Sequence, residues 1–432
     1  MSILRSLNTG ASGLRSHGEA LGVVGDNIAN VNTTGFKRSR AQFEDILGRS
    51  IAGPDAAPAA GGGVRLASIE QMWSQGALLT TESPTDLALT GDGFFVVEGN
   101  VSGTHGEYYT RAGQFHIDAN GVIVNPAGMK LQGYGVDANG NLQGTVSDLT
   151  IAPGTIAASP STRVDLSLNF DANAQVPVAA WDPADPAGTS NFSTAVTVYD
   201  SLGNAHEVTT YFRKTAANAW EWHAMVDGGE LTGGTPGIPT EGAGGTLTFN
   251  TSGALDTETP GASSFGFAGA APGQAIVFDF GTSVTGDGGT GLDATTQFGS
   301  PFTTNGIAQD GYAAGSVAGI SIASDGTIVG VFTNGQRRTL GQVAVADFAS
   351  VDGLERAGDG LWTATQASGA ALVGSAESGG RGSIVAGALE QANVDLGREF
   401  VDLIAYQRGF QANSRIITTS DQLYQELINL KR

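Results

Sequence analysis

Large apolar side chains recur at every seventh residue near the end of the chain, in a segment at 388–432 that contains no proline. The repeating positions are Leu389, Leu396, Leu403, Phe410, Ile417 and Tyr424. A repeat of this period is typical of a helix that packs lengthwise against another helix. Because one such helix cannot bury its apolar stripe alone, the pattern requires a partner.

A second ladder with the same spacing begins the chain. Its positions are Leu7, Leu14, Leu21 and Ile28, and small residues follow at Ala11, Gly18 and Gly25. Small side chains would let another helix approach closely, although each glycine costs a helix about 1 kcal/mol relative to alanine. We therefore expect a helix over residues 2–29 that forms mainly by packing. The expected pair consists of long helices of the coiled-coil type at 1–30 and 386–432.

The sequence between these ends has the pattern of β structure. Short alternating or apolar runs are separated by turns such as Asp-Ala-Asn-Gly, and the chain holds 65 glycines. Candidate strands in the second half of this region are RVDLSLNF, STAVTVYD, AHEVTTYFRK, AWEWHAMV, GTLTFN and AIVFDF. Such runs bounded by turn-forming residues predict all-β domains. A segment rich in glycine, alanine and proline, within residues 31–75, is expected to act as a connector.

Charge and cysteine content exclude several classes of function. The chain has 42 acidic and 21 basic residues, for a net charge of −21, and no cysteine. An acidic surface argues against nucleic acid or anionic membrane as partners. Without cysteine there is no disulfide, thiolate nucleophile or cysteine metal site. No apolar run approaches the roughly 20 residues of a membrane span, so membrane insertion is not expected.

A signature follows the first predicted helix. It consists of Asn27, Ala29, Asn30, Thr34, Gly35, Phe36 and Lys37. This pattern resembles the N-terminal signature of the bacterial flagellar axial proteins, which include rod and hook subunits. The run QRGFQANSRII at 407–417 resembles the C-terminal signature of the same family. Gly93, Phe94 and Phe95 match a segment that its rod and hook members share, where turns and a β core explain them.

The resemblance is to the hook branch of the family. The run TVYDSLGNAHEVTTYF at 197–212 is similar to a motif of the outer domain of hook proteins, and a distal rod subunit has no domain of this size. The resemblance implies an α+β, multidomain fold in which the terminal helices bracket discontinuous all-β domains. The inner β domain would comprise 76–145 and 311–385, with an outer β domain inserted at 146–310.

A structural role follows from this resemblance. It implies a subunit that assembles with its own copies into a flexible curved tube, which transmits torque from rod to filament. The implied partners are a distal rod protein, a hook cap protein, a hook–filament junction protein and the flagellar export apparatus. The implied location is extracellular, in the flagellar hook, and the apolar ladders would form the self-assembly seam. The alternatives are a distal rod or other axial subunit, and a secreted calcium-binding or adhesive β protein.

No set of residues predicts an enzyme, a cofactor or a metal site. The five histidines are scattered, and no nucleophile, phosphate-binding or zinc motif occurs. The run GGTGLDATT at 288–296 matches the start of a calcium-binding β-roll repeat, but a single repeat cannot stack, so we expect a glycine-rich loop. Trp220 and Trp222 share one strand face, which indicates core packing or a subunit contact.

Overall fold

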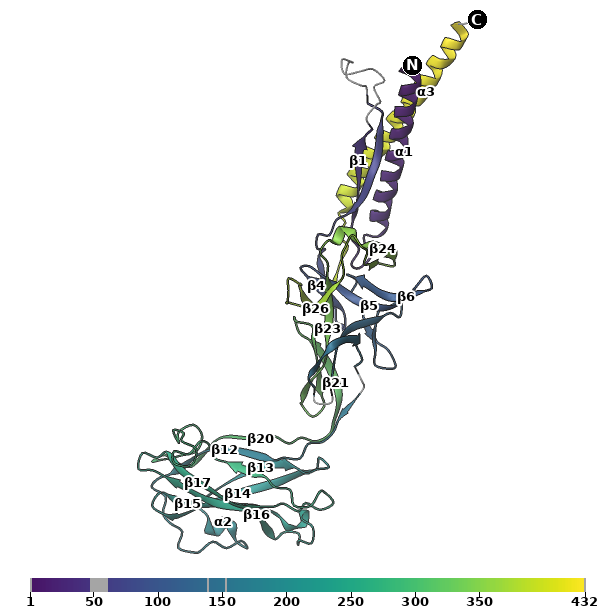
Figure 1. Cartoon of the computed structure of the whole chain (residues 1–432). Coiled ribbons are helices and arrows are strands. Elements are labelled where there is room, and N and C mark those ends of the chain that lie inside the picture. Colours follow the sequence, from purple (N-terminus) through teal and green to yellow (C-terminus); the bar gives the residue numbers. More distant parts are fainter. Residues whose placement is uncertain (1, 47–60, 138–139, 152–153, 431–432) are drawn as a thin grey trace. The chain divides into compact units, whose positions relative to one another are not determined.

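The computed structural model describes residues 2–46, 61–137, 140–151 and 154–430. The chain divides into two compact units, each described here by itself. Unit 1 comprises Met1–Pro153, Ala318–Val331 and Arg337–Arg432, and unit 2 comprises Gly154–Val317 and Phe332–Gln336. Helices at both chain ends and strands between them confirm the α+β, multidomain class (Figure 1).

Two long helices of unit 1 pack side by side. They are α1 (Ser2–Ala29) and α3 (Leu396–Leu430), and the start of α1 lies beside the end of α3 (Figure 1). A Cβ atom added at Gly10 would lie 3.1 Å from Ile417, and one added at Gly13 would lie 2.6 Å from Asn413. The close approach therefore depends on these glycines, and not on the exposed Ala11 and Gly25. Coiled-coil character stays a prediction.

The bounds of α1 are those that the sequence predicts, but the start of α3 is not. Residues Ala388–Glu390 form β28, which pairs with β3 (Leu78–Thr80), so the expectation of a helix from about 386 was wrong. The helix begins at Leu396 because the Asp395 side chain accepts hydrogen bonds from the Gly397 and Arg398 N–H groups at 2.8 and 3.2 Å.

A hairpin lies along the helix pair. Its strands β1 (Ser39–Asp45) and β2 (Val64–Gln71) are antiparallel and contact α1. The Phe43 ring of β1 contacts the rings of His17 on α1 and Tyr406 on α3, with centroids 5.6 and 5.9 Å away. The predicted connector at 31–75 includes this hairpin, and its residues 47–60 lie outside the described residues.

The main sheet of unit 1 mixes strands from both halves of the chain. Its principal order is β21 (Gly315–Ile322), β22 (Thr327–Phe332), β23 (Arg337–Asp347), β9 (Lys130–Val136), β5 (Phe94–Val101), β6 (Thr104–Thr110), β25 (Leu361–Thr363) and β24 (Glu355–Gly358). Shorter strands join it or pair nearby: β4 (Leu87–Thr90) with β27 (Ser383–Ala386), β7 (His116–Ile117) with β8 (Ile123–Val124), β10 (Leu142–Asp148) with β9, and β26 (Leu372–Ser375) with β23. The segment before unit 2 and the segment after it thus share one hydrophobic core.

Unit 2 is built from two β-sheets around one core. The first has the order β13 (Phe192–Tyr199), β14 (Ala205–Ala216), β15 (Ala219–Asp227), β16 (Pro239–Phe249) and β17 (Leu255–Ser263). The second contains β12 (Arg163–Asp171), flanked by β18 (Val277–Asp279), β19 (Thr296–Phe298) and β20 (Thr303–Gln309). Two short elements, β11 (Thr155–Ile156) and α2 (Pro186–Thr189), complete the unit.

The inner faces of both sheets supply the core of unit 2. Phe170 of β12 stacks on Trp220 of β15 with ring centroids 4.7 Å apart, and its ring centroid lies 5.0 Å from that of Phe212 of β14. Trp220 and Trp222 are fully buried, which confirms the core-packing interpretation of this pair. The indole N–H of Trp220 donates to Gln297 at 3.0 Å, so burial leaves that group satisfied.

Candidate functional site

The predicted signature lies where the chain leaves α1 and enters the β structure of unit 1. Gly35 has a φ of +69°, and a Cβ atom there would lie 2.5 Å from the Ala112 backbone nitrogen. Its N–H donates to the Glu390 carbonyl at 2.7 Å. Only glycine fits both the backbone conformation and this close contact. The N-terminal signature is therefore hydrogen-bonded to strand β28, which lies far away from it in the sequence.

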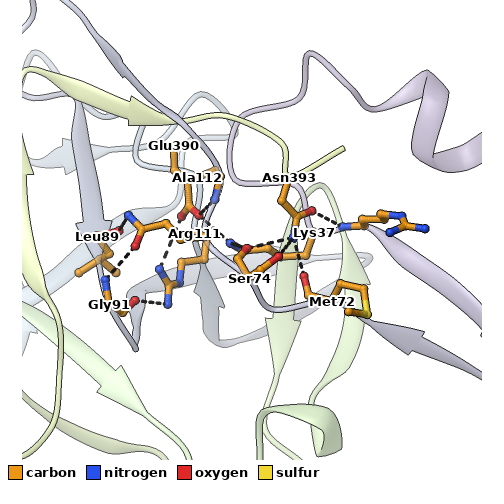
Figure 2. Close-up of polar contacts among 12 residues, drawn as sticks. Lys37, Met72, Ser74, Leu89, Gly91, Arg111, Ala112, Glu390 and Asn393 are labelled. Carbon is orange, nitrogen blue, oxygen red and sulfur yellow. Dashed lines mark hydrogen bonds and ion pairs between the residues drawn. The ribbon is translucent and has the colours of Figure 1, made fainter. Parts of the chain in front are cut away.

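A buried lysine follows two residues later. Lys37 Nζ lies 2.6 Å from Glu390 Oε1 and donates to the Ser74 carbonyl at 2.9 Å (Figure 2). The side chains of Lys37 and Glu390 are 1% and 0% exposed. Burial lowers the pKa of Lys37, and the Glu390 carboxylate opposes that shift. The ion pair is therefore enclosed in protein.

Arg111 approaches the same carboxylate from another segment. Its Nη2 donates to the Gly91 carbonyl at 2.7 Å, and its Nη1 lies 3.5 Å from Glu390 Oε2 (Figure 2). Burial lowers the pKa of Arg111, and Glu390 is the largest opposing influence. The Gly76 N–H adds a hydrogen bond to Glu390 Oε1 at 2.9 Å. The Glu390 carboxylate thus connects the segments that carry Lys37, Gly76 and Arg111 to its own segment. We call this cluster, together with the residues described below that are bonded to it, the polar joint.

Asn27 extends the polar joint to the helices. Its Oδ1 accepts from the Ser39 N–H at 2.8 Å, and its Nδ2 donates to the Ser39 carbonyl at 2.8 Å and to Glu399 on α3 at 3.0 Å. The Arg38 guanidinium pairs with the same Glu399 carboxylate. Asn27 is 1% exposed, so these bonds fix the end of α1 to the first turn of α3.

Asn393 closes the joint from the segment between β28 and α3. Its Oδ1 accepts from the Arg38 N–H at 2.7 Å, and its Nδ2 donates to the Met72 and Ser74 carbonyls at 2.6 and 2.9 Å (Figure 2). Sequence reasoning missed this residue. It also missed the roles of Arg38, Arg111, Glu390 and Glu399, because their partners are hundreds of residues away and no local pattern separates a buried charge from a solvated one.

The remaining signature residues lie at the edge of the joint. Phe36 is 5% exposed, and the Arg356 guanidinium lies 5.6 Å from its ring centroid. The Asn30 side chain donates to the Asp26 carbonyl at 2.9 Å and so ends the helix locally. Ala29 is exposed and Thr34 is half-buried. The signature therefore contains both residues that join segments and residues that shape the turn.

Seven members of the predicted seam are partly covered in the structure. The half-buried members are Leu7, Leu14, Leu21, Ile28, Leu403, Phe410 and Ile417. Leu396 and Tyr424 are exposed by 40% and 48%, and Leu389 lies in β28 instead of the helix. Further exposed apolar side chains on α3 are Phe400, Val401, Ile404, Ile416, Leu423 and Ile428. One side of α3 thus remains uncovered by the described parts of its own chain.

The described residues contain no group of three or more histidine, aspartate or glutamate side chains placed to hold a metal ion. Among them, no helix is long and apolar enough to cross a membrane. The predicted loop at 288–296 is closed by Asp293, which accepts hydrogen bonds from the Thr282 N–H and Oγ1 at 3.1 and 2.8 Å. The polar joint therefore has a structural role, because its charged groups pair with one another and so connect segments of the chain.

Comparison with known families assigns most of the chain to flagellar proteins. The matching models are "Flagella basal body rod protein" at 7–37, "Flagellar hook protein FlgE/F/G D1 domain" at 88–173, "Flagellar basal body protein FlaE D2 domain" at 169–312 and "Flagellar basal body rod FlgEFG protein C-terminal" at 385–430. The polar joint therefore draws its residues from several matched regions.

Similar proteins extend the match to the whole chain. The flagellar hook protein of Borreliella burgdorferi is 36% identical over 99% of this chain and 100% of its own length. That of Salmonella typhimurium is 35% identical over 99% of this chain and 100% of its own. The crystal structure of a Helicobacter pylori flagellar hook protein has a TM-score of 0.50 at 15% identity, covering 71% of this chain and 98% of that one.

Proposed function

This chain belongs to the flagellar hook protein family, and from that membership we propose how its parts serve a hook subunit. It is a structural subunit of the bacterial flagellar hook and not an enzyme. Copies of it assemble into the flexible curved tube that transmits torque from rod to filament. The observation that supports this function most strongly is that about a third of the residues are identical to those of hook proteins over the full length of those proteins.

The proposed assembly elements are the terminal helices. α1 packs along α3, while Phe400, Val401 and Ile404 on α3 are exposed by 51%, 66% and 49%. Exposed apolar side chains in a row on a helix favour association. We assign the inner layer of the tube to α1 and α3, and the outer layers to the β structure at 76–145 with 311–385 and at 146–310.

The polar joint gives this arrangement a mechanical role. Torque must pass between the helices and the β structure of unit 1 without separating them. Glu390, Lys37 and Arg111 form this connection deep in the protein, where ion pairs are little screened by salt. We assign to the joint the task of keeping each subunit rigid at this point while contacts between subunits shift.

Its partners and its route out of the cell are further parts of the proposal. We assign end contacts of the polymer to a distal rod protein, a hook cap protein and a hook–filament junction protein. The subunit would leave the cell as an unfolded chain through the flagellar export apparatus. The lack of cysteine supports this route, since no disulfide can obstruct threading.

Electron microscopy of basal bodies from a strain lacking the gene tests the function. Complete rods without hooks are expected. Rods that stop short would indicate a rod subunit instead, an alternative that the full-length match to hook proteins does not favour. Intact flagella would contradict any axial role. Plasmid-borne restoration of the gene is the matched control, because it must return hooks to the same strain.

A further inference from the structure

An asparagine followed by a glycine is the dipeptide that deamidates most readily in proteins, and the chain contains such pairs at 120–121, 139–140, 305–306 and 334–335. In this reaction the glycine backbone nitrogen gives its proton to water or hydroxide and bonds to the asparagine Cγ atom, and the side-chain nitrogen leaves as ammonia. Water then opens the cyclic imide to aspartate or isoaspartate. Glycine favours the attack because it has no Cβ atom to obstruct it. Residue 139 lies outside the described residues, and the other three pairs differ in how they are held.

The pair at 120–121 is held in a tight turn between β7 and β8. The Gly121 N–H donates to the Asp118 carbonyl at 3.0 Å, and the Asn120 side-chain amide donates to Asp118 Oδ2 at 3.2 Å. The Asn120 N–H also donates to Asp118 Oδ1, at 2.9 Å. Both reacting groups are therefore engaged, and the attack would have to break their hydrogen bonds first.

The pair at 334–335 is held in the same way in the turn between β22 and β23. The Gly335 N–H donates to the Phe332 carbonyl at 2.9 Å. The Asn334 side chain donates to the Ala313 carbonyl at 2.7 Å and accepts from the Gln336 N–H at 3.1 Å. The amide that would react is thus bonded to two other parts of the chain, and the attacking nitrogen is bonded as well.

The pair at 305–306 lies in a β-bulge of β20. In the pairing with β12, Gly306 lies opposite Ser167 and Thr304 lies opposite Leu168. Asn305 is therefore the extra residue, which a bulge leaves without a cross-strand partner. It is exposed, and its side chain makes no hydrogen bond to any residue that the structure describes. A Cβ atom added at Gly306 would lie 3.8 Å from the Ser167 Cβ atom, its nearest neighbour, so the space around the attacking residue is open.

We propose that Asn305 is the site at which the folded chain deamidates, while Asn120 and Asn334 stay intact. The product carries a new carboxylate on β20, which pairs only with β12 among the described strands. In the isoaspartate form, the backbone of β20 also contains one additional methylene group at the bulge. The inference goes beyond the proposed hook function and does not depend on it. In a hook, the modified fraction would increase with the age of the subunits.

Peptide mapping by mass spectrometry tests this site in the full-length chain. The folded chain is incubated at pH 8, because the attacking nitrogen must lose its proton, and conversion is followed as a gain of one dalton. Asn305 should convert faster than Asn120 and Asn334 by about tenfold or more, since the hydrogen bonds of the latter two oppose the attack. In a chain unfolded by urea the three sites should convert at comparable rates. Equal rates in the folded chain, or a folded Asn305 that converts only after unfolding, would overturn the proposal.

Two variants test the physical reason. Gly306→Ala should slow the conversion of Asn305 about tenfold without changing the melting of unit 2, because the added Cβ atom obstructs the attack and has room in the fold. Asp118→Ala removes the side-chain acceptor of Asn120 and should speed the conversion of Asn120 in the folded chain. An unchanged rate at Asn305 in the first variant would exclude the cyclic imide route. An unchanged rate at Asn120 in the second would show that hydrogen bonds do not decide which pair reacts, and would contradict the proposal.

Discussion

Glu258 of β17 is a carboxyl group whose surroundings favour its neutral form. Burial raises the pKa of Glu258 to about 7, and the nearby Asp279 and Asp287 carboxylates act in the same direction. The Phe280 N–H, at 3.4 Å, and Arg163 oppose the shift. An unfolded chain would release this proton near pH 4.3. Around neutral pH the folded unit therefore retains a proton that the unfolded chain has lost.

This difference predicts a dependence of stability on pH. Because the folded pKa is raised, the stabilising contribution of the protonated carboxyl is full below about pH 4.3 and is lost as the pH rises to about 7. Glu258→Gln should remove that loss and stabilise unit 2 at pH 8 by about 1–2 kcal/mol, a value reduced for solvent screening of a partly exposed group. Urea unfolding of both chains at pH 5 and pH 8 measures how the substitution changes the free energy of unfolding of unit 2. A benefit of the same size at both pH values would contradict the prediction.

At the scale of elements, local sequence patterns predicted those helices and strands whose positions depend on local interactions. The heptad ladder gave the bounds of α1, and alternating runs located strands such as β14 and β15, because periodicity reflects which side of an element is buried. The start of α3 was wrong because Leu389 continues the seven-residue spacing while lying in β28. Its strand partner at Leu78–Thr80 is far away in sequence, so no local pattern shows the pairing.

The polar joint was predictable only in part, for the same reason. The signature at residues 27–37 was found by its resemblance to a family, and Gly35 by its turn chemistry. Nothing in the sequence around Lys37 distinguishes it from an exposed lysine. Its side chain is buried against Glu390, which is 353 positions further along the chain. Long-range pairing of this kind depends on the assembled sheet and cannot be read from composition or spacing.

The helix pair carries a prediction about assembly. Leu403 of α3 is half-buried in the predicted seam, so Leu403→Asp places a charge in an apolar contact and should weaken it by about 2–4 kcal/mol. The expected result is loss of hooks in electron micrographs with little change in the β-sheet signal of circular dichroism. Gln411→Asp is the control, because Gln411 is exposed on the same helix. Normal hooks from the Leu403 variant would show that this part of the seam is dispensable.

On the scale of the whole molecule, each unit has its own core. The core of unit 2 is built from the facing sides of its two sheets, around Phe170, Phe212 and Trp220. The core of unit 1 comprises two clusters, and each of them combines strands from before and after unit 2 in sequence. A unit with a continuous core of its own generally unfolds as a cooperative body. The chain should therefore show two unfolding transitions.

A substitution in one unit should shift the unfolding transition of that unit and leave the transition of the other unit unchanged. Glu390→Gln removes the charge that Lys37 and Arg111 share, and an unpaired buried charge costs about 3–5 kcal/mol, so the transition of unit 1 should fall. Phe212→Ala should lower that of unit 2 by about 3–5 kcal/mol through loss of core packing. Scanning calorimetry of the full-length chain measures both, with the exposed Glu355→Gln as control for the first. A single transition that either variant shifts as a whole would show that the two units unfold together, and the joint would then stabilise the entire subunit.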